Sequence, residues 1–299
     1  MINGLSTKIS EGKKIMKIFS TVFLVAILIF STSLGYANPK KSGITPEQEH
    51  MEMLYPTVLV RLANGTGSGT VIYSELDENQ SYASYVLTNY HVIQSYIKIT
   101  EVWSPEKNKH VETENRRPVN IDLWEYNNFS TAIGTMGRIA DIMAYDKSRD
   151  LALLRVKDTE RQMPYVATLY PEGLDEGPWI FQTVYAVGAG LGKPPFPTMG
   201  LLAGYGRDQD GNELYLSSSP IIFGNSGGSL YVYSPRRTYE LIGVPSMVSA
   251  YGWGNVVSHM AWSRPIAEIR IFLRENKYGF IIGDNPEPKE EEENEDEKD

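Results

Sequence analysis

A serine enclosed by glycines, in the segment Gly224-Asn225-Ser226-Gly227-Gly228, has the clearest chemical potential in the sequence. Glycine accepts backbone conformations that other residues avoid, and it leaves room for another chain to approach the serine. A tight turn of this kind also lets the backbone N–H groups of Gly224 and Ser226 point at one place, where they can stabilise an oxyanion. The segment therefore predicts a nucleophilic serine with its own oxyanion hole. Taken alone, it fits a structural glycine-rich turn equally well.

A serine hydroxyl needs a nearby base whose pKa is close to the working pH, and histidine supplies such a base. The sequence contains four histidines. His91 follows the β-type run 86–88 and precedes a predicted turn, whereas His50 and His110 lie in polar stretches. We therefore predict His91 as the general base, with His259 on a late predicted strand as the alternative.

An aspartate lies directly before a strongly apolar β-type run, since Asp150 precedes residues 151–156. A half-buried carboxylate at the start of a strand can accept the Nδ1–H of a histidine, which fixes the tautomer and stabilises the imidazolium. Asp150 is therefore predicted to orient the histidine. An aspartate that only caps the strand would give the same sequence pattern. Asp141 and Asp146 are alternatives, but neither precedes so strong an apolar run.

The elements that must position these residues are mostly strands. Short β-type runs between about residues 54 and 261, separated by Gly, Pro and Asn, predict an all-β sandwich or barrel rather than βαβ units. Residues 265–276 have apolar side chains at helical spacing after a first-turn proline, and they predict a helix. The glycine-rich run 188–192 leads into Lys193-Pro194-Pro195 and opens no helix, so we interpret it as a turn. No cofactor and no metal site is predicted.

The three candidate residues follow one another along the chain in the order His, Asp, Ser. The double-barrel proteases use this order, whereas α/β-hydrolases and subtilisins do not. The sequence here resembles the trypsin-like serine peptidases, in particular their cysteine-free bacterial HtrA/Deg branch. The resemblance covers about residues 56–273. The segments that carry it are Gly67-Ser68-Gly69-Thr70-Val71-Ile72, Leu87-Thr88-Asn89-Tyr90-His91-Val92-Ile93, Asp150-Leu151-Ala152-Leu153-Leu154, Val184-Tyr185-Ala186-Val187-Gly188, residues 224–228 and Leu241-Ile242-Gly243-Val244.

This resemblance implies an all-β fold of two six-stranded Greek-key β-barrels with a C-terminal helix, and a catalytic site in the cleft between the barrels. It also implies a serine endopeptidase that works through an acyl-enzyme and acts on polypeptide substrates, among them unfolded or misfolded proteins. Asn225 stands where the digestive enzymes of animals carry an aspartate that pairs with a newly released amino terminus. An uncharged side chain cannot form that ion pair, so we expect no activation of this kind.

The resemblance also indicates a substrate-binding set. Pro220 stands where trypsin itself has a charged pocket base, and no acidic residue is available there for Lys or Arg. Cleavage after small or apolar side chains is therefore expected. The predicted set consists of Pro220, Ile222, Phe223, Val244, Pro245 and Ser246.

The peptidase domain is predicted at residues 53–283. His91 and Asp150 are 59 positions apart, more than the HtrA pattern needs, and we interpret the excess as an inserted hairpin or loop at about 104–135. Loops of this kind often carry specificity. The chain stops soon after the predicted helix, which leaves no room for the PDZ module that is usual in HtrA proteins.

Both termini differ in composition from this domain. Lys13, Lys14 and Lys17 precede an apolar run at 18–30 and small residues up to Ala37, which predicts a secretory signal peptide at 1–37. An uncleaved anchor is the alternative, but the apolar run is shorter than the roughly 20 residues of a span. The predicted location is therefore periplasmic or extracellular, with no stable membrane span after signal cleavage. Residues 38–52 are a predicted linker, and the acid-rich stretch 284–299 is a predicted disordered tail.

Composition excludes several classes of function. The net charge is −9, and the sequence shows no cluster of Lys and Arg that could bind phosphates, so nucleic acid is not an expected partner. The absence of cysteine excludes a thiol nucleophile and a disulfide framework. Two alternatives to a peptidase remain: a catalytically silent protease-like binding or chaperone module, and an esterase on another fold, which the residue order disfavours.

Overall fold

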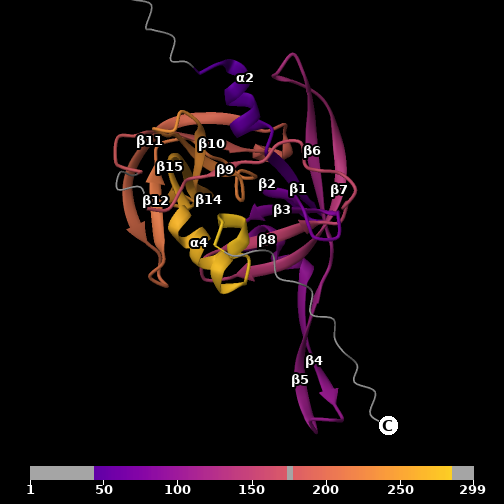
Figure 1. The fold of residues 1–299 in the computed structure, drawn as a ribbon. Coiled ribbons are helices and arrows are strands. Elements are labelled where there is room, and N and C mark those ends of the chain that lie inside the picture. Colours follow the sequence, from indigo (N-terminus) through magenta and orange to yellow (C-terminus); the bar gives the residue numbers. More distant parts are fainter. Residues whose placement is uncertain (1–43, 174–177, 285–299) are drawn as a thin grey trace, which may run out of the picture. The chain divides into compact units, whose positions relative to one another are not determined.

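The computed structural model describes residues 44–173 and 178–284. The predicted signal peptide and nearly all of the predicted acidic tail lie outside these residues. Within them, strands dominate, and they form two barrels followed by a helix (Figure 1). No helix in this described part is long and apolar enough to cross a membrane.

Barrel 1 is a closed six-stranded barrel with the strand order β1-β2-β3-β8-β7-β6. Its core is made by inward-facing side chains that alternate along the strands, such as Val58 and Val60 on β1 and Val119 and Ile121 on β6. The strand bounds are β1 (Thr57–Leu62), β2 (Gly65–Leu76), β3 (Tyr82–Thr88), β6 (Val119–Asn127), β7 (Thr131–Asp146) and β8 (Leu151–Val156).

Barrel 2 also closes with six strands, in the order β13-β10-β11-β12-β15-β14, because β14 pairs with both β15 and β13. A short seventh strand, β9 (Thr168–Leu169), runs parallel to β14. The predicted fold of two six-stranded barrels is therefore confirmed. The strand bounds are β10 (Thr183–Gly188), β11 (Phe196–Arg207), β12 (Glu213–Ser217), β13 (Ser229–Tyr233), β14 (Tyr239–Tyr251) and β15 (Asn255–Pro265).

The predicted C-terminal helix is present as α4 (Ile266–Glu275), with Pro265 as its N-cap residue. Ile266, Ile269 and Leu273 are buried, as their spacing predicts. A 3₁₀ turn, η4 (Gly279–Ile282), follows and packs Phe280 against Tyr73 and Tyr85 of barrel 1. The glycine-rich run forms the turn η3 (Gly190–Gly192), with Leu191 at a φ of 54°.

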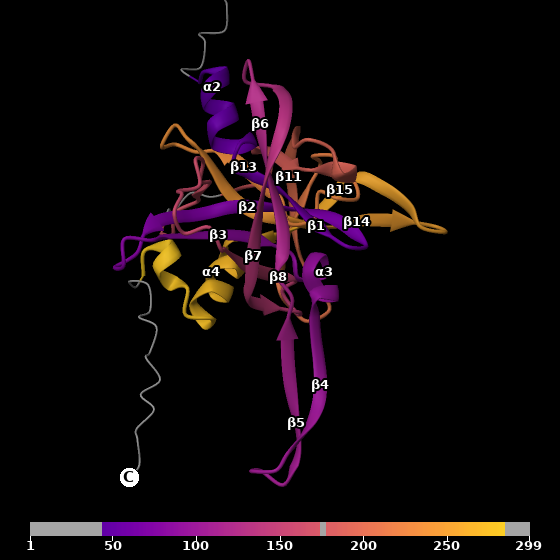
Figure 2. The ribbon, with the colours of Figure 1, turned by 90° about the vertical axis from the view of Figure 1, so that its right-hand side faces the viewer.

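The chain between His91 and Asp150 is organised differently from the predicted insertion at 104–135. After the short helical turns α3 (Tyr90–Ile93) and η2 (Gln94–Tyr96), strands β4 (Ile97–Ser104) and β5 (Lys109–Arg116) form a separate two-stranded sheet. Figure 2 shows this hairpin projecting from the barrel below α3. Residues 119–135 belong instead to β6 and β7 of barrel 1, where polar side chains on the outer face conceal the strands in the sequence.

Part of the predicted linker at 38–52 is helical. Thr45 caps α2 (Pro46–Glu49) by accepting a hydrogen bond from the N–H of Gln48 at 3.2 Å, and Pro46 occupies the first helical position. The π-helical turn η1 (His50–Leu54) follows, and Glu52 accepts a hydrogen bond from the N–H of Tyr239 at 2.8 Å. These contacts attach residues 45–54 to barrel 2.

A buried ion pair within barrel 2 provides a stability test. The Arg264 side chain is 2% exposed and its Nη1 lies 2.8 Å from Oδ2 of Asp208. Burial alone would raise the pKa of Asp208, but hydrogen bonds from Arg264 and Asn212 outweigh it and hold this pKa below its ordinary value. We expect Arg264→Met to lower the free energy of unfolding by about 3 kcal/mol, because Asp208 keeps a partly buried charge without its partner.

Denaturant unfolding checks this expectation at two pH values. The pair stabilises the fold above the unfolded-state pKa of Asp208, about 4, and the stabilisation is lost as pH falls through the lower folded-state pKa. The loss caused by Arg264→Met should therefore be full at pH 7 and shrink in strong acid. The double variant with Asp208→Asn should lose less than Arg264→Met alone; an equal or larger loss would refute the ion-pair explanation.

Candidate active site

His91 and Asp150 are in direct contact. The ring nitrogen Nδ1 of His91 lies 2.8 Å from Oδ2 of Asp150, and the backbone N–H of His91 donates to Oδ1 at 2.9 Å. A carboxylate only accepts hydrogen bonds, so Nδ1 carries the proton and Nε2 is left free to act as a base. His91 is about two-fifths exposed on its side chain, so Nε2 can meet a substrate.

The elements that hold this contact are β3, α3 and the turn before β8. β3 and β8 pair as neighbours in barrel 1, with Thr88 opposite Ala152. The end of β3, which leads into α3 and His91, therefore lies beside the start of β8, which Asp150 precedes. Asn89 strengthens the contact by donating from Nδ2 to the Asp150 carbonyl at 2.7 Å. Because the β4–β5 hairpin leaves the barrel, its length does not separate the two residues.

The turn that carries Asp150 is held by Arg149, a residue that the sequence analysis did not single out. Asp150 has a φ of 52°, a left-handed conformation that a non-glycine residue adopts only at a cost. Arg149 donates to Asp146 at 2.6 Å within the turn, and to Glu268 at 3.0 Å and Glu275 at 2.8 Å on α4. The C-terminal helix thus anchors the turn from outside barrel 1.

This anchoring predicts a positioning role for Arg149. In Arg149→Met the turn loses its contacts to α4, and we expect kcat to fall about 10- to 100-fold with KM little changed, because small displacements of catalytic groups have effects of this size. Arg149→Lys should recover part of the rate by restoring one ion pair. Separate measurement of kcat and KM for peptide hydrolysis, together with the partial rescue by Arg149→Lys, checks the mechanism. A lower Tm with unchanged kcat would show a purely structural role.

The Ser226 loop is fixed against both barrels. Gly224 and Gly227 have φ values of 96° and 84°, which favour glycine. The Ser226 carbonyl accepts a hydrogen bond from the N–H of Ser68 at 2.8 Å, and the N–H of Gly227 donates to the Pro245 carbonyl at 3.1 Å. A side chain at position 227 would collide with the backbone of Ser68 on β2 and with Thr88 on β3.

The serine loop and the His91 turn pack on the same residue. A Cβ atom placed on Gly67 would lie 2.6 Å from Cγ1 of Val92, the neighbour of His91, and 3.3 Å from the Ser226 carbonyl. The Ser226 carbonyl and the side chain of the residue after His91 thus both lie against Gly67. Within the described residues the Ser226 hydroxyl makes no hydrogen bond; contacts of this kind often tighten only in the substrate complex.

Two backbone N–H groups are available as an oxyanion hole. The Phe223 carbonyl accepts a hydrogen bond from the N–H of Leu191 at 2.8 Å. Because C=O and N–H point in opposite directions across a trans peptide, the N–H of Gly224 faces away from that contact. Among the described residues neither this N–H nor that of Ser226 has a hydrogen-bond partner. Both groups can therefore donate to an oxyanion.

The predicted substrate-binding residues divide into exposed and buried ones. Pro220, Ile222 and Phe223 are on the surface, and Phe223 is 73% exposed. Val244 is 0% exposed, which corrects its assignment, since its side chain offers no surface to a substrate. The Pro245 carbonyl holds the serine loop. Ser246 is buried and its hydroxyl donates to Oδ2 of Asp150, a contact that no sequence signal indicates.

The alternative catalytic residues lie in other environments. His259 is on the exposed part of β15. Asp141 forms an ion pair with Lys157 at 3.2 Å, and Asp146 binds Arg149. Neither aspartate contacts a histidine among the residues that the structure describes.

Comparison with known proteins agrees with this geometry. Residues 67–243 match the model of the trypsin-like peptidase domain. No curated protein sequence matches the chain. The structure of the HtrA-type protease AlgW with a tripeptide superimposes with a TM-score of 0.54 at 17% identity, over 79% of this chain and 64% of that one. A serine endoprotease from Yersinia pestis gives a TM-score of 0.51 at 18% identity, over 81% and 68%.

These structural matches show the fold, and the chain spans less than two thirds of the AlgW chain. The family match extends over more than half of the present chain. The chain therefore belongs to the family of trypsin-like peptidases.

Proposed function

We propose that the protein hydrolyses peptide bonds with Ser226 as nucleophile, His91 as general base and Asp150 as the residue that orients the histidine. The contact of 2.8 Å between His91 Nδ1 and Asp150 Oδ2 carries this proposal, because it leaves Nε2 of the ring free to act as a base. The free N–H groups of Gly224 and Ser226 supply the second requirement, stabilisation of the oxyanion.

The reaction proceeds in two stages. Nε2 of His91 takes the proton of the Ser226 hydroxyl as its oxygen attacks the substrate carbonyl, and Asp150 stabilises the imidazolium. The tetrahedral oxyanion accepts hydrogen bonds from Gly224 and Ser226, and the imidazolium then protonates the departing amine. Water, deprotonated by His91, releases the acyl group in the second stage.

The mature enzyme needs no zymogen cleavage in this proposal. Asn225 is 1% exposed, and its Oδ1 accepts a hydrogen bond from the N–H of Ile222 at 3.3 Å. The side chain next to the nucleophile thus supports the loop through a neutral contact, without a charged amino terminus. A requirement for a defined cleavage inside the folded domain would contradict this part of the proposal.

We further propose an exported enzyme, based on the signal-like sequence at 1–37, and a preference for small or apolar side chains at the cleaved bond. The exposed Ile222 and Phe223 beside the serine loop support that preference, and Pro220 contributes no acid. Extended or unfolded polypeptides are the expected substrates, because an endopeptidase needs access to a stretch of backbone.

Labelling with a fluorophosphonate tests the proposed nucleophile. The reagent phosphonylates a serine only when a base activates it, so the full-length protein should be modified and mass spectrometry of its peptides should locate the adduct on Ser226. His91→Ala should abolish labelling and His259→Ala should leave it unchanged. An unlabelled, folded protein would indicate the catalytically silent module instead, and an adduct on another serine would refute the assignment.

A further inference from the structure

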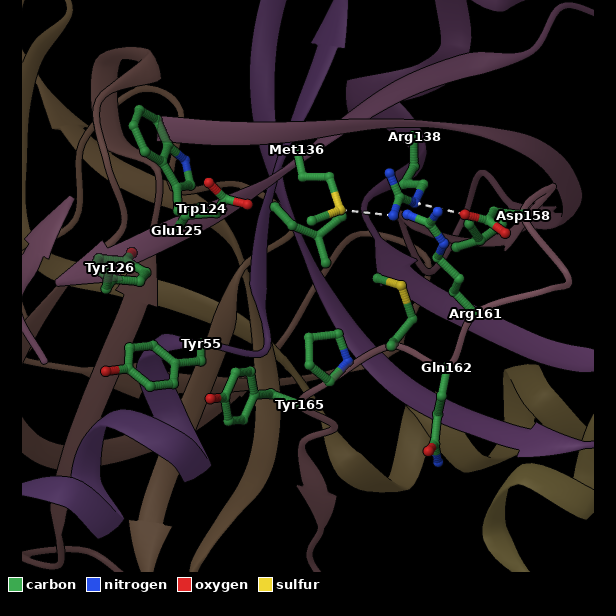
Figure 3. A pocket seen from close by; sticks show the side chains of 14 residues that line it. Tyr55, Trp124, Glu125, Tyr126, Met136, Arg138, Asp158, Arg161, Gln162 and Tyr165 are labelled. Carbon is green, nitrogen blue, oxygen red and sulfur yellow. Dashed lines mark hydrogen bonds and ion pairs between the residues drawn. The ribbon is translucent and has the colours of Figure 1, made fainter. Parts of the chain in front are cut away.

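A cavity of about 450 Å³ opens on barrel 1, and Figure 3 shows the side chains that line it. Val156, the last residue of β8, lines it, whereas Asp150 lies just before the first residue of the same strand. At roughly 3.3 Å per residue, the six residues of β8 separate the two places by about 20 Å. The cavity is therefore distinct from the catalytic residues.

One wall of the cavity is aromatic. Tyr55 stacks on Tyr126 with ring centroids 5.0 Å apart and contacts Tyr165 at 4.7 Å. Met136 and Met163 also line the cavity, and their flexible side chains can adapt to different apolar shapes. The volume and the apolar lining are those of a small-ligand site.

Two buried hydrogen-bonding groups lie in the same wall without partners. Nε1 of Trp124 and the hydroxyl of Tyr126 are inaccessible to solvent and make no hydrogen bond within the described part of the chain. Burial, followed by the effect of Tyr55, raises the pKa of Tyr126, so its hydroxyl stays protonated. Indole N–H is only a donor and a tyrosine hydroxyl can be one, so carbonyl oxygens of a ligand would satisfy both after a shift of the wall exposes them.

The rim of the cavity carries two opposite charges that are not paired with each other. Arg138 binds Asp158 at 3.0 Å, which neutralises that pair. Arg161 and Glu125 line the same cavity and form no ion pair among the described residues. Figure 3 shows them on either side of Met136. The cavity thus offers a guanidinium at one end and a carboxylate at the other.

We infer that this cavity binds a short apolar peptide with free termini, whose carboxylate contacts Arg161 and whose ammonium contacts Glu125. Its apolar side chains pack on the tyrosines and methionines, and its backbone carbonyls can accept from Trp124 and Tyr126 once a shift of the wall exposes these two donors. A peptidase releases peptides of this kind, but the binding site itself does not depend on the proposed catalysis.

Calorimetric titration of the full-length Ser226→Ala protein tests the inference without hydrolysis of the ligand. The probes are the tripeptide Ala-Leu-Phe, its N-acetyl form and its C-terminal amide. We expect the unmodified peptide to bind, and each modification to weaken binding about tenfold, since each removes one charge-assisted contact. Because binding is measured in a protein without the nucleophile, failure of the proposed proteolysis would leave the result intact.

Variants assign the two ends. In Arg161→Gln the unmodified peptide and its C-terminal amide should bind equally, while N-acetylation should still weaken binding. In Glu125→Gln the unmodified and the N-acetylated peptide should bind equally, while amidation of the C-terminus should still weaken binding. Arg207→Gln, an exposed arginine on barrel 2, is the matched control and should change neither difference. No binding at millimolar peptide, no effect of blocking the termini, or equal weakening of acid and amide by Arg161→Gln would each overturn the inference.

Discussion

Replacing Ser226 by alanine is expected to lower the rate of casein hydrolysis by about 10⁴- to 10⁶-fold. The substitution removes the atom that forms the acyl-enzyme, and water can then attack the substrate only with help from the oxyanion hole. Because the carbonyl and N–H groups of residue 226 remain, the contact with Ser68 persists and the protein should keep its fold. Initial rates and circular dichroism on the full-length pair check both expectations.

Ser258→Ala is the matched control for this variant. Ser258 lies on β15, its hydroxyl makes no hydrogen bond within the described residues, and its loss should leave the rate within about twofold. If Ser226→Ala and the unaltered protein hydrolysed casein equally fast, the assigned nucleophile would be wrong. If neither protein hydrolysed casein or a set of apolar peptides, the binding or chaperone module would be the better explanation.

The second large effect is expected from Asp150→Asn, which should lower kcat by about 10⁴-fold. The amide can keep the contact with His91, but a donating Nδ2 facing Nδ1 would hold the ring in the tautomer whose Nε2 carries the proton and cannot act as a base. The charge that stabilises the imidazolium is lost as well. Peptide hydrolysis at pH 7 measures the fall in kcat.

Asp141→Asn is the control for Asp150→Asn, because Asp141 is a half-exposed residue of the same barrel whose one ion pair within the described residues is with Lys157. It should retain nearly full activity. The two variants should also have similar melting temperatures, since each exchange preserves the shape of the side chain. A fall in kcat of less than tenfold in Asp150→Asn would mean that another group orients His91, and Ser246, which contacts the same carboxylate, would be the first to test.

Local features of the sequence were sufficient to predict much of this molecule. The alternation of β-type runs and turns indicates two barrels once the family resemblance is added, and the apolar spacing at Ile266, Ile269 and Leu273 marks α4. Ser226 and His91 could be singled out because glycines and a strand end flank them within a few residues. Such signals lie in contiguous segments, so the sequence displays them directly.

Tertiary structure decided the contacts between segments far apart in the chain. Asp150 reaches His91 because β3 and β8 pair and the β4–β5 hairpin leaves the barrel, which their separation of 59 positions does not reveal. The boundaries of that hairpin were predicted wrongly because β6 and β7 have a polar outer face. Ser246 and Arg149 support Asp150 through hydrogen bonds to partners 96 and up to 126 positions away.

The serine loop, the histidine and the aspartate were thus each recognisable from the sequence, and Ser226 with its glycines most clearly. Which groups hold them in place could be read only from the folded chain. A hydrogen bond depends on distance and direction in space, and these are set by strand pairing and barrel closure rather than by neighbouring residues in the chain.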